Sequence, residues 1–277
     1  MRYGIDVCTL GEFAEPGRVV EVARAAEAAG WEALFVWDHL AFAWGVPSAD
    51  PWVVLAAAAQ ATDRLLLGTA VTPLPRRRPA VVANAVATLD RLSNGRVVLG
   101  VGIGGVAVEY AAFGEDAGER SRAERLDEGL AVVAGLLGGE RVAHAGVHYT
   151  VDGVALAPPP VQRPRVPIWV GGHSRAALRR AARHDGWIAA GDDESGTMTL
   201  SPEAVREAVG YVSRHRDGGE FAVALVGVSR GPDDALFAAY EGAGVTWWLE
   251  HVHGRRGTYD ELLARVSAGP PAVRSRP

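Results

Sequence analysis

Eight short apolar runs alternate along the chain with amphipathic helical stretches, and this alternation constrains the fold more than any other feature. The runs have the length and composition of buried β-strands. They cover Tyr3–Cys8, Ala33–Trp37, Leu65–Val71, Val97–Ile103, Ile168–Gly171, Trp187–Ala190, Phe221–Val228 and Val245–Leu249. The helical stretches cover Pro16–Ala29, Pro51–Thr62, Pro79–Leu92, Glu119–Leu137, Ser174–His184, Pro202–Arg214, Pro232–Glu241 and Thr258–Val266. Eight strand-then-helix units predict an α/β fold, a closed (β/α)8 TIM barrel.

The length of the chain suits one barrel with a small insertion. Its 277 residues, 48% of them hydrophobic, are enough for one large core. We therefore predict a single barrel domain over residues 1–267. Residues 138–167 combine a short alternating run around Gly146–Leu156 with five prolines, which predicts an insertion made of a small hairpin and an extended link. Residues 268–277, rich in Pro, Ser and Arg, are predicted to be a disordered tail.

Charge and cysteine content limit the class of partner. The net charge of −5 is spread along the chain without a basic block, so we expect a small-molecule ligand and neither nucleic acid nor a membrane surface. The single cysteine, Cys8, lies in the first apolar run and is predicted to be a buried small hydrophobe. No signal-peptide pattern and no apolar run of about 18 residues is present, so we expect a cytoplasmic location.

The fourth strand ends in a cluster of glycines. Residues 96–105 read Arg-Val-Val-Leu-Gly-Val-Gly-Ile-Gly-Gly, a pattern that predicts close approach of backbone to a ligand, with Gly102 and Gly104 as candidate contacts. The glycines superficially match a dinucleotide-binding fingerprint. However, no acidic residue ends a second strand about 20 residues later, as a Rossmann fold requires.

In barrels of this kind the chemistry lies on the loops that follow the carboxyl ends of the strands. The second run ends in Trp37-Asp38-His39, and we predict Asp38 and His39 to be catalytic. A histidine can exchange a proton near neutral pH, and a carboxylate beside it can hold its tautomer. The alternative is that Asp38 caps a turn and His39 is an ordinary loop residue. Trp44, further along this loop, either covers the pocket by stacking or covers only the barrel rim.

The third run ends in small residues, which leave room for a flat ring against the backbone. Three arginines follow it, and Arg78 is the best of them for the anionic part of a long cofactor. Arg76 and Arg77 are predicted to form a solvated cluster.

The fifth run passes through a glycine turn into a helix. Gly171, Gly172, His173 and Ser174 form this turn, and free backbone N–H groups at a helix start favour a phosphate. The alternative is a tight turn that needs glycine only for its backbone conformation.

The last strand-then-helix unit carries Trp248 in its apolar run and Glu250 and His251 directly after that run. We predict these three residues to line the substrate pocket. With His253, two of them could suggest a metal site. Three ligands within four residues do not converge easily on one ion, and no partner cluster exists elsewhere in the sequence, so no metal site is predicted.

Several blocks, taken in order, resemble the bacterial luciferase-like family over roughly residues 3–250. They begin at Glu27 (Glu-Ala-Ala-Gly-Trp), Phe35 (Phe-Val-Trp-Asp-His), Asp50 (Asp-Pro-Trp), Leu67 (Leu-Gly-Thr-Ala-Val-Thr-Pro), Ala87 (Ala-Thr-Leu-Asp-Arg-Leu-Ser-Asn-Gly-Arg), Leu99 (Leu-Gly-Val-Gly-Ile-Gly), Pro167 (Pro-Ile-Trp-Val-Gly-Gly) and Asp185 (Asp-Gly-Trp). The resemblance implies a β/α barrel that binds reduced FMN or the deazaflavin coenzyme F-420. It also implies a homodimer.

The resemblance assigns roles to individual positions. Asp38 and His39 match an Asp-His pair beside the cofactor ring in deazaflavin-dependent members, in which the histidine is often assigned proton transfer. Thr69, Ala70 and Val71 match the segment in which such members carry a non-proline cis peptide that supports the ring. Gly171, Gly172 and Ser174 match the turn that holds the cofactor phosphate.

One departure from the family pattern bears on the substrate. Deazaflavin-dependent sugar-phosphate dehydrogenases that resemble this chain carry a glutamate directly after the Gly-x-Gly of the fourth strand, where this chain has Gly105. That substrate is therefore not transferred. Glu109 can reach the pocket only if the loop folds back.

Three functions follow from these patterns. The favoured one is hydride transfer between reduced coenzyme F-420 and a small organic substrate, because the pair Asp38 and His39 is typical of the deazaflavin branch. The second is an FMNH2-dependent monooxygenase, which needs a partner flavin reductase. The third is a non-catalytic flavin-binding barrel.

Overall fold

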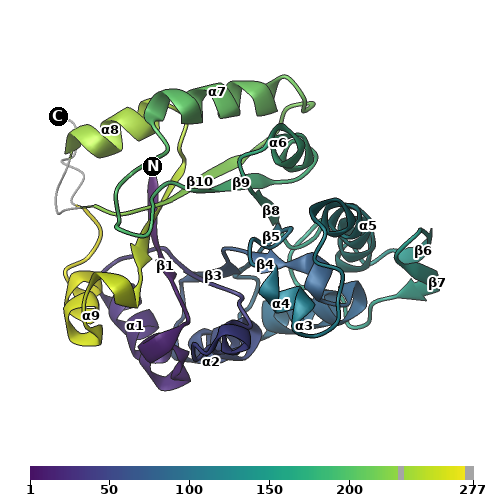
Figure 1. The fold of residues 1–277 in the computed structure, drawn as a ribbon, viewed down its shortest axis with the longest axis horizontal. Coiled ribbons are helices and arrows are strands. Elements are labelled where there is room, and N and C mark those ends of the chain that lie inside the picture. The colour runs from purple at the N-terminus through teal and green to yellow at the C-terminus, as the bar shows by residue number, and fades with distance from the viewer. Residues whose placement is uncertain (230–233, 272–277) are drawn as a thin grey trace.

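Eight parallel strand positions close into a barrel in the computed structural model, which describes residues 1–229 and 234–271 (Figure 1). The strands are β1 (Arg2–Val7), β2 (Ala33–Val36), β3 (Leu66–Thr69) with its continuation β4 (Thr72–Pro73), β5 (Val97–Gly102), β8 (Ile168–Gly171), β9 (Gly186–Ala190), β10 (Ala222–Gly227) and β11 (Trp247–Val252). They pair in the order β3-β2-β1-β11-β10-β9-β8-β5-β4, and the pairing of β3 with β5 closes the ring. The predicted TIM barrel is confirmed.

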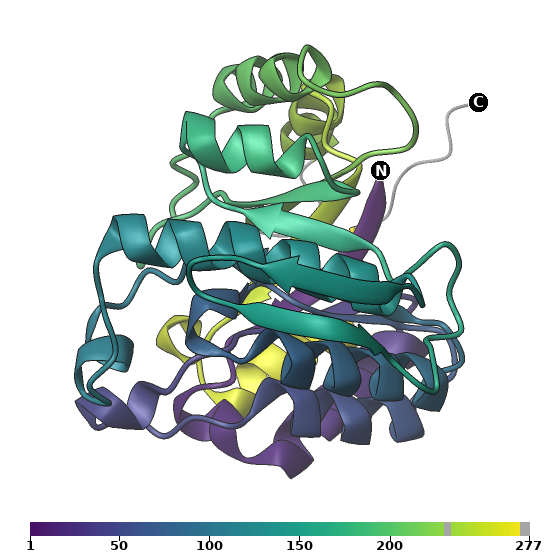
Figure 2. The same ribbon diagram turned by 90° about the vertical axis from the view of Figure 1, so that its right-hand side faces the viewer.

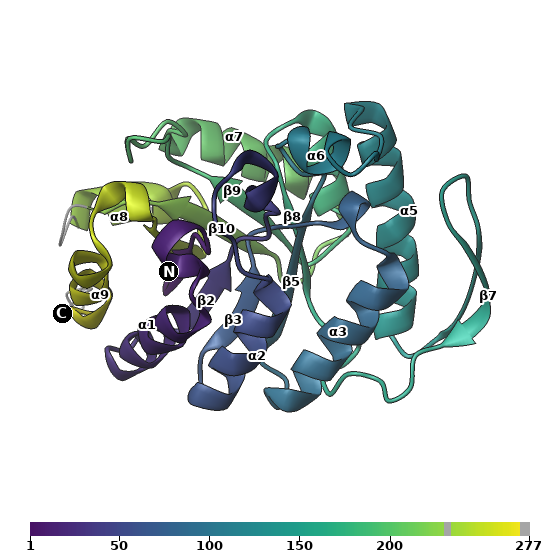
Figure 3. The same cartoon turned by 60° about the horizontal axis from the view of Figure 1, so that its bottom comes forward.

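Helices surround the barrel on its outside (Figure 3). They are α1 (Pro16–Ala28), α2 (Pro51–Ala61), α3 (Pro79–Leu92), α4 (Val108–Ala111), α5 (Glu119–Leu137), α6 (Arg175–Ala181), α7 (Pro202–Ser213), α8 (Asp234–Gly242) and α9 (Tyr259–Ser267), with 3-10 helices η1 (Gly11–Ala14), η2 (Ala41–Trp44), η3 (Leu74–Arg76) and η4 (Gly254–Arg256). Proline opens α1, α2, α3 and α7, where its missing N–H costs no hydrogen bond. Pro232, at the start of one predicted helix, lies outside the described residues.

The insertion forms a hairpin on the outer side of α5 (Figure 2). Its antiparallel strands are β6 (Arg141–Ala145) and β7 (Thr150–Ala155). Glu128 of α5 holds the turn between them, because its carboxylate accepts the backbone N–H groups of Val147, His148 and Tyr149 at 2.9–3.0 Å. The predicted hairpin is confirmed, although its first strand precedes the alternating run that indicated it.

Aromatic side chains fill the interior of the barrel. Phe35 stacks on Trp169 with ring centroids 5.4 Å apart, and Trp169 contacts Trp247 at 6.0 Å. Two glycines leave the space these rings need: a Cβ at Gly68 would lie 2.5 Å from the Phe35 ring, and one at Gly186 would lie 2.6 Å from Trp169. The interior below the strand ends is therefore packed core, as in other barrels of this type.

The glycines of β5 make room for the protein's own chain. A Cβ at Gly100 would lie 1.8 Å from the carbonyl oxygen of Thr69, and one at Gly102 would lie 2.8 Å from Val71. Gly104, at φ +76°, would place its Cβ 2.5 Å from the hydroxyl of Tyr110. Gly100 thus serves this packing, and its neighbour is the β3–β4 segment. Gly102 and Gly104 serve this packing and also line a cavity.

Within the described residues, no helix is long and apolar enough to cross a membrane. Ala268 and Gly269, the first residues of the predicted tail, continue from α9, and Gly269 packs beside Ala29. Residues 272–277 of that tail lie outside the described residues. Cys8 is buried, and burial raises the pKa of its thiol to about 12.

Candidate active site

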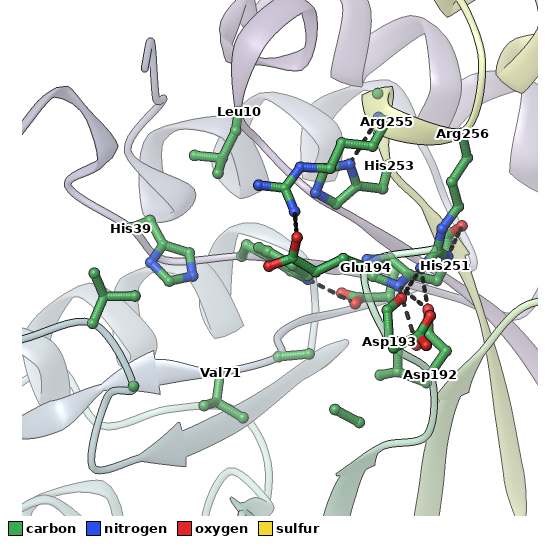
Figure 4. A pocket seen from close by; sticks show the side chains of 18 of the residues that line it. Leu10, His39, Val71, Asp192, Asp193, Glu194, His251, His253, Arg255 and Arg256 are labelled. Carbon is green, nitrogen blue, oxygen red and sulfur yellow. Dashed lines mark hydrogen bonds and ion pairs between the residues drawn. The ribbon is translucent and has the colours of Figure 1, made fainter. Parts of the chain in front are cut away.

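A cavity of about 1330 Å³ opens at the carboxyl ends of the strands (Figure 4). Most of the predicted site residues line it, and these are His39, Trp44, Ala70, Val71, Gly102, Gly104, Gly171, Gly172, His173 and His251. The peptide bond between Ala70 and Val71 is cis, as the family resemblance implies.

His39 is held by a buried glutamate. Its Nδ1 lies 2.7 Å from Oε1 of Glu109, a residue of α4 whose side chain is 1% exposed. The same oxygen accepts the backbone N–H of Leu40 at 2.8 Å. Because a carboxylate only accepts, Nδ1 of His39 is the donor in this contact, and in a neutral imidazole Nε2 then keeps the lone pair. The loop after β5 therefore folds back and brings Glu109 to His39. The predicted place of Glu109 in the substrate pocket is corrected, because its side chain is buried and is not among the described residues that line the cavity.

Two indole rings fix the plane of this imidazole. The ring of Trp37 lies 5.5 Å from that of His39, and Trp44 approaches it edge-on at 5.9 Å. Trp37 in turn donates its Nε1–H to Asp6 at 2.8 Å, so its own orientation is also fixed. These two ring contacts limit the rotamers of His39, whose side chain is 24% exposed and lines the cavity.

Asp38 does not join His39 in the cavity. Its side chain is fully buried behind the wall, where it accepts hydrogen bonds from Arg76 at 2.5 Å and from Arg77 at 2.8 Å. The predicted catalytic role is thus corrected to an anchor, because both carboxylate oxygens are occupied by guanidinium groups. The predicted solvated cluster is wrong as well, since Arg76 is only 4% exposed. The second guanidinium nitrogen of Arg76 lies 3.5 Å from Glu109 and links the two acids.

Three predicted cofactor contacts have other partners. Arg78 is exposed and borders a separate cavity of about 210 Å³ between α2 and α3. Thr69 is buried and donates its hydroxyl to the carbonyl oxygen of Gly100 at 2.8 Å. Ser174 accepts the backbone N–H of Ala177 and caps α6. None of the three is among the described residues that line the main cavity.

Trp248 and Glu250 face away from the cavity. Trp248 packs against Phe237 of α8 at 5.0 Å, and Glu250 accepts hydrogen bonds from Trp248 at 2.9 Å and from Ser229. Both predictions fail for one reason: alternate residues of β11 point to opposite sides, and His251 has the inward position. The three polar residues that could suggest a metal therefore do not share one side of the strand.

A second polar group lies across the cavity from His39 (Figure 4). Of its members, His251 is predicted from the sequence to line the pocket, and the others are not. Nδ1 of His251 lies 3.0 Å from Asp192, which also binds Arg256. Burial opposes the charge of Asp192, yet the hydrogen bond from His251 and the charges of His251 and Arg256 hold its pKa below the usual range. Asp6 of β1 completes the group. A charged residue inside an apolar strand run was the one signal for it in the sequence.

The stability of the protein should depend on pH through Asp6. Burial raises the pKa of this carboxyl to about 6, against 3.8 in an unfolded chain, while the charge of His251 and the hydrogen bond from Trp37 act in the opposite sense. The folded state thus holds the proton more tightly, so ionisation destabilises it. We expect the free energy of unfolding of the wild type, relative to Asp6→Asn, to fall by roughly 2 kcal/mol between pH 4 and pH 7.

Urea unfolding of both proteins at several pH values measures this difference. A difference between wild type and Asp6→Asn that stays constant from pH 4 to pH 7 contradicts the argument.

One wall of the cavity fits a flat cofactor. Ala70, Gly102 and Gly105 present little or no side chain there, and a Cβ at Gly105 would meet nothing within 4 Å. At the next strand, Gly172 has φ +112°, and its carbonyl accepts the Nε1–H of Trp187 at 2.8 Å. A ring can lie against the first group, and the second is a fixed turn with space for a phosphate.

Comparison with known proteins identifies the family. The family model described as luciferase-like monooxygenase matches residues 5–270. The chain belongs to this family. An uncharacterised protein of Mycobacterium tuberculosis is 34% identical over 214 residues, which cover 70% of this chain and 73% of that protein.

One further relative and one solved structure have a described activity. An F-420-dependent glucose-6-phosphate dehydrogenase of Microbacterium testaceum is 35% identical over 211 residues, covering 73% of this chain and 61% of that enzyme. The solved structure of an F-420-dependent secondary alcohol dehydrogenase in complex with an F-420–acetone adduct has a TM-score of 0.81 at 19% identity and covers 99% of both chains. Membership of the luciferase-like family makes this chain an oxidoreductase of the flavin or deazaflavin type.

Proposed function

We propose that this chain transfers hydride between coenzyme F-420 and a small organic substrate at the carboxyl-end mouth of the barrel. The observation that carries the proposal is the imidazole of His39, fixed by Glu109 and open to a cavity whose adjacent wall is built from small residues. Relatives at 35% identity that use F-420 support the choice of cofactor.

The cofactor would be held by the backbone and small side chains at the strand ends. Its ring would lie against Ala70, Val71 and Gly102, and its phosphate would lie at Gly172 and His173. When bound, the deazaflavin accepts or donates the hydride. Burial lowers the pKa of His173, and an uncharged imidazole there leaves the backbone N–H groups as the donors at the turn.

His39 would move the proton that accompanies the hydride. When the carbon of a substrate alcohol gives up hydride, its hydroxyl must lose a proton to become a carbonyl. The lone pair on Nε2 accepts that proton, and Glu109, hydrogen-bonded to Nδ1, stabilises the imidazolium that forms. In the reverse direction the imidazolium returns the proton to the new oxygen. Trp37 and Trp44 orient the ring.

Gly172→Val tests the placement of the phosphate. A side chain at φ +112° is strained, and its Cβ would lie 3.0 Å from that of Ala177 at the start of α6. We expect the Kd for F-420 to rise at least about tenfold, because the turn must shift away from the phosphate. Calorimetric titration measures this, and circular dichroism checks the fold. Wild-type affinity in a folded variant would refute this position for the phosphate.

Oxygen dependence separates hydride transfer from oxygenation. The purified protein is mixed with F-420 and a panel of charged and uncharged alcohols under argon, and reduction of the cofactor is followed by absorbance. We expect reduction without oxygen. Turnover that needs reduced FMN, a flavin reductase and oxygen would instead establish a monooxygenase. No turnover with any reductant would establish a non-catalytic barrel.

A further inference from the structure

Both arginines that line the cavity within the described residues are already paired. Arg256 of η4 binds Asp192. The side chain of Arg256 is 11% exposed and that of Asp192 is 2% exposed. It also lies 3.2 Å from the carbonyl oxygen of Asp193. Arg255 pairs with Glu194 at 2.9 Å across the mouth, as Figure 4 shows. The charge of each arginine is thus already balanced by a carboxylate, so a phosphate or carboxylate on a substrate would also meet the negative charge of that carboxylate.

The other carboxylates of the lining also have partners inside the protein. Oδ2 of Asp6 accepts from Trp37 at 2.8 Å, while its Oδ1 has no partner among the described residues but lies on a residue that is fully buried. Asp193 accepts the backbone N–H groups of Ser195 and Thr197 at 2.9 and 3.0 Å. At the rim, Glu12 pairs with Arg18 at 3.0 Å, and Glu261 closes the capping box of α9. A substrate ammonium would therefore have to take a carboxylate from an existing hydrogen-bond donor or cation.

The surface between these groups is apolar. Leu10, Val46, Ile188 and Val226 line it beside the rings of Trp37 and Trp44. Three polar atoms of the described lining residues are without a hydrogen-bond partner, namely Oδ1 of Asp6, Nε of Arg256 and Nε2 of His251, and all three are buried. The orientation of the His251 ring is set by the contact of its Nδ1 with Asp192.

We propose that the substrate is an uncharged hydroxyl or carbonyl compound with a largely apolar body, and that this cavity rejects phosphorylated substrates. The inference rests on the proposed hydride-transfer function and names its substrate class. A charge brought into this wall finds no free opposite charge, and burying an unpaired charge is costly. An uncharged oxygen needs one hydrogen bond, and an apolar body gains from burial. The proposed substrate thus differs from the sugar phosphate in the name of the glucose-6-phosphate dehydrogenase relative.

Three ligands with one ring test this proposal: cyclohexanol, cyclohexyl phosphate and cyclohexylamine. Each is titrated calorimetrically into the F-420-loaded protein near pH 7, where the last two are charged. We expect a Kd for cyclohexanol at least about tenfold below those of the charged compounds. A charged compound that binds as tightly as cyclohexanol overturns the proposal, and so does the absence of cyclohexanol binding. A separate F-420 titration reports on the proposed function. If the cofactor does not bind, cyclohexylamine and cyclohexanol are compared in the cofactor-free protein, because the phosphate compound could then bind at the turn of Gly172.

Two variants test whether the ion pairs cause the preference for uncharged ligands. Asp192→Asn keeps the shape of the side chain but leaves Arg256 without its carboxylate, so we expect its Kd for cyclohexyl phosphate to fall at least about tenfold. Glu194→Gln frees Arg255 and serves if the first variant does not fold. The matched control is Glu207→Gln, which frees the surface Arg175 at an ion pair of 2.5 Å outside the cavity and should change nothing. Unchanged phosphate affinity in folded Asp192→Asn and Glu194→Gln overturns the assignment.

Discussion

Replacing His39 with glutamine lowers turnover at least about a hundredfold, while the Kd for F-420 stays within about threefold of the wild type. Glutamine keeps a polar group of similar length but cannot take up a proton near neutral pH. The loss therefore falls on the proton-transfer step and not on binding. Steady-state kinetics with an alcohol that the wild type oxidises, together with a cofactor titration, separate these two effects.

Two further variants show whether the loss of turnover is specific to His39 and depends on its contact with Glu109. His215→Gln is the matched control, because His215 is exposed and stacks on Tyr211 at 4.2 Å outside the cavity. It should turn over like the wild type. Glu109→Gln removes the charge that holds Nδ1, and we expect it to shift the pH profile of turnover as well as lower the rate. A His39→Gln variant with unchanged turnover would remove His39 from the mechanism.

Gly100→Ala is expected to lower the free energy of unfolding by more than about 4 kcal/mol or to prevent folding. The added Cβ would lie 1.8 Å from the carbonyl oxygen of Thr69 and 2.9 Å from Ile188, inside the closed barrel. Backbone on two hydrogen-bonded strand positions would have to move apart, because Thr69 also donates its hydroxyl to Gly100. Urea unfolding measures the loss.

Gly105→Ala is the matched control for this substitution. It belongs to the same glycine-rich segment, but a Cβ there would meet nothing within 4 Å. We expect its stability to stay within about 0.5 kcal/mol of the wild type. A Gly100→Ala protein that loses less than about 1 kcal/mol would show that the close approach of β5 to Thr69 is not required by the fold.

The barrel could be predicted from the sequence because its signals are local. Each strand is a short apolar run bounded by turn residues, and most helices begin at a proline or at a serine or threonine cap. The side-chain direction along β11 could not be obtained so simply. The strand runs from Trp247 to Val252, whereas the apolar run ends at Leu249, and the inward positions depend on that register.

The site was harder to predict because its contacts join distant parts of the chain. Asp38 and His39 are neighbours in sequence, yet Asp38 is bound by Arg76, 38 residues further on, and His39 by Glu109, 70 residues further on. His39 and not Asp38 reaches the cavity, because Arg76 and Arg77 bind Asp38. Loop conformations decide this, and no local pattern encodes them.

The identity of the cofactor tests most directly whether this chain transfers hydride. We would titrate the purified protein with F-420 and, separately, with FMN, each in both redox states, and follow the binding by calorimetry. A deazaflavin-dependent enzyme predicts a Kd for F-420 at least about a hundredfold below that for FMN. Tighter binding of reduced FMN than of F-420 would contradict the proposed hydride transfer.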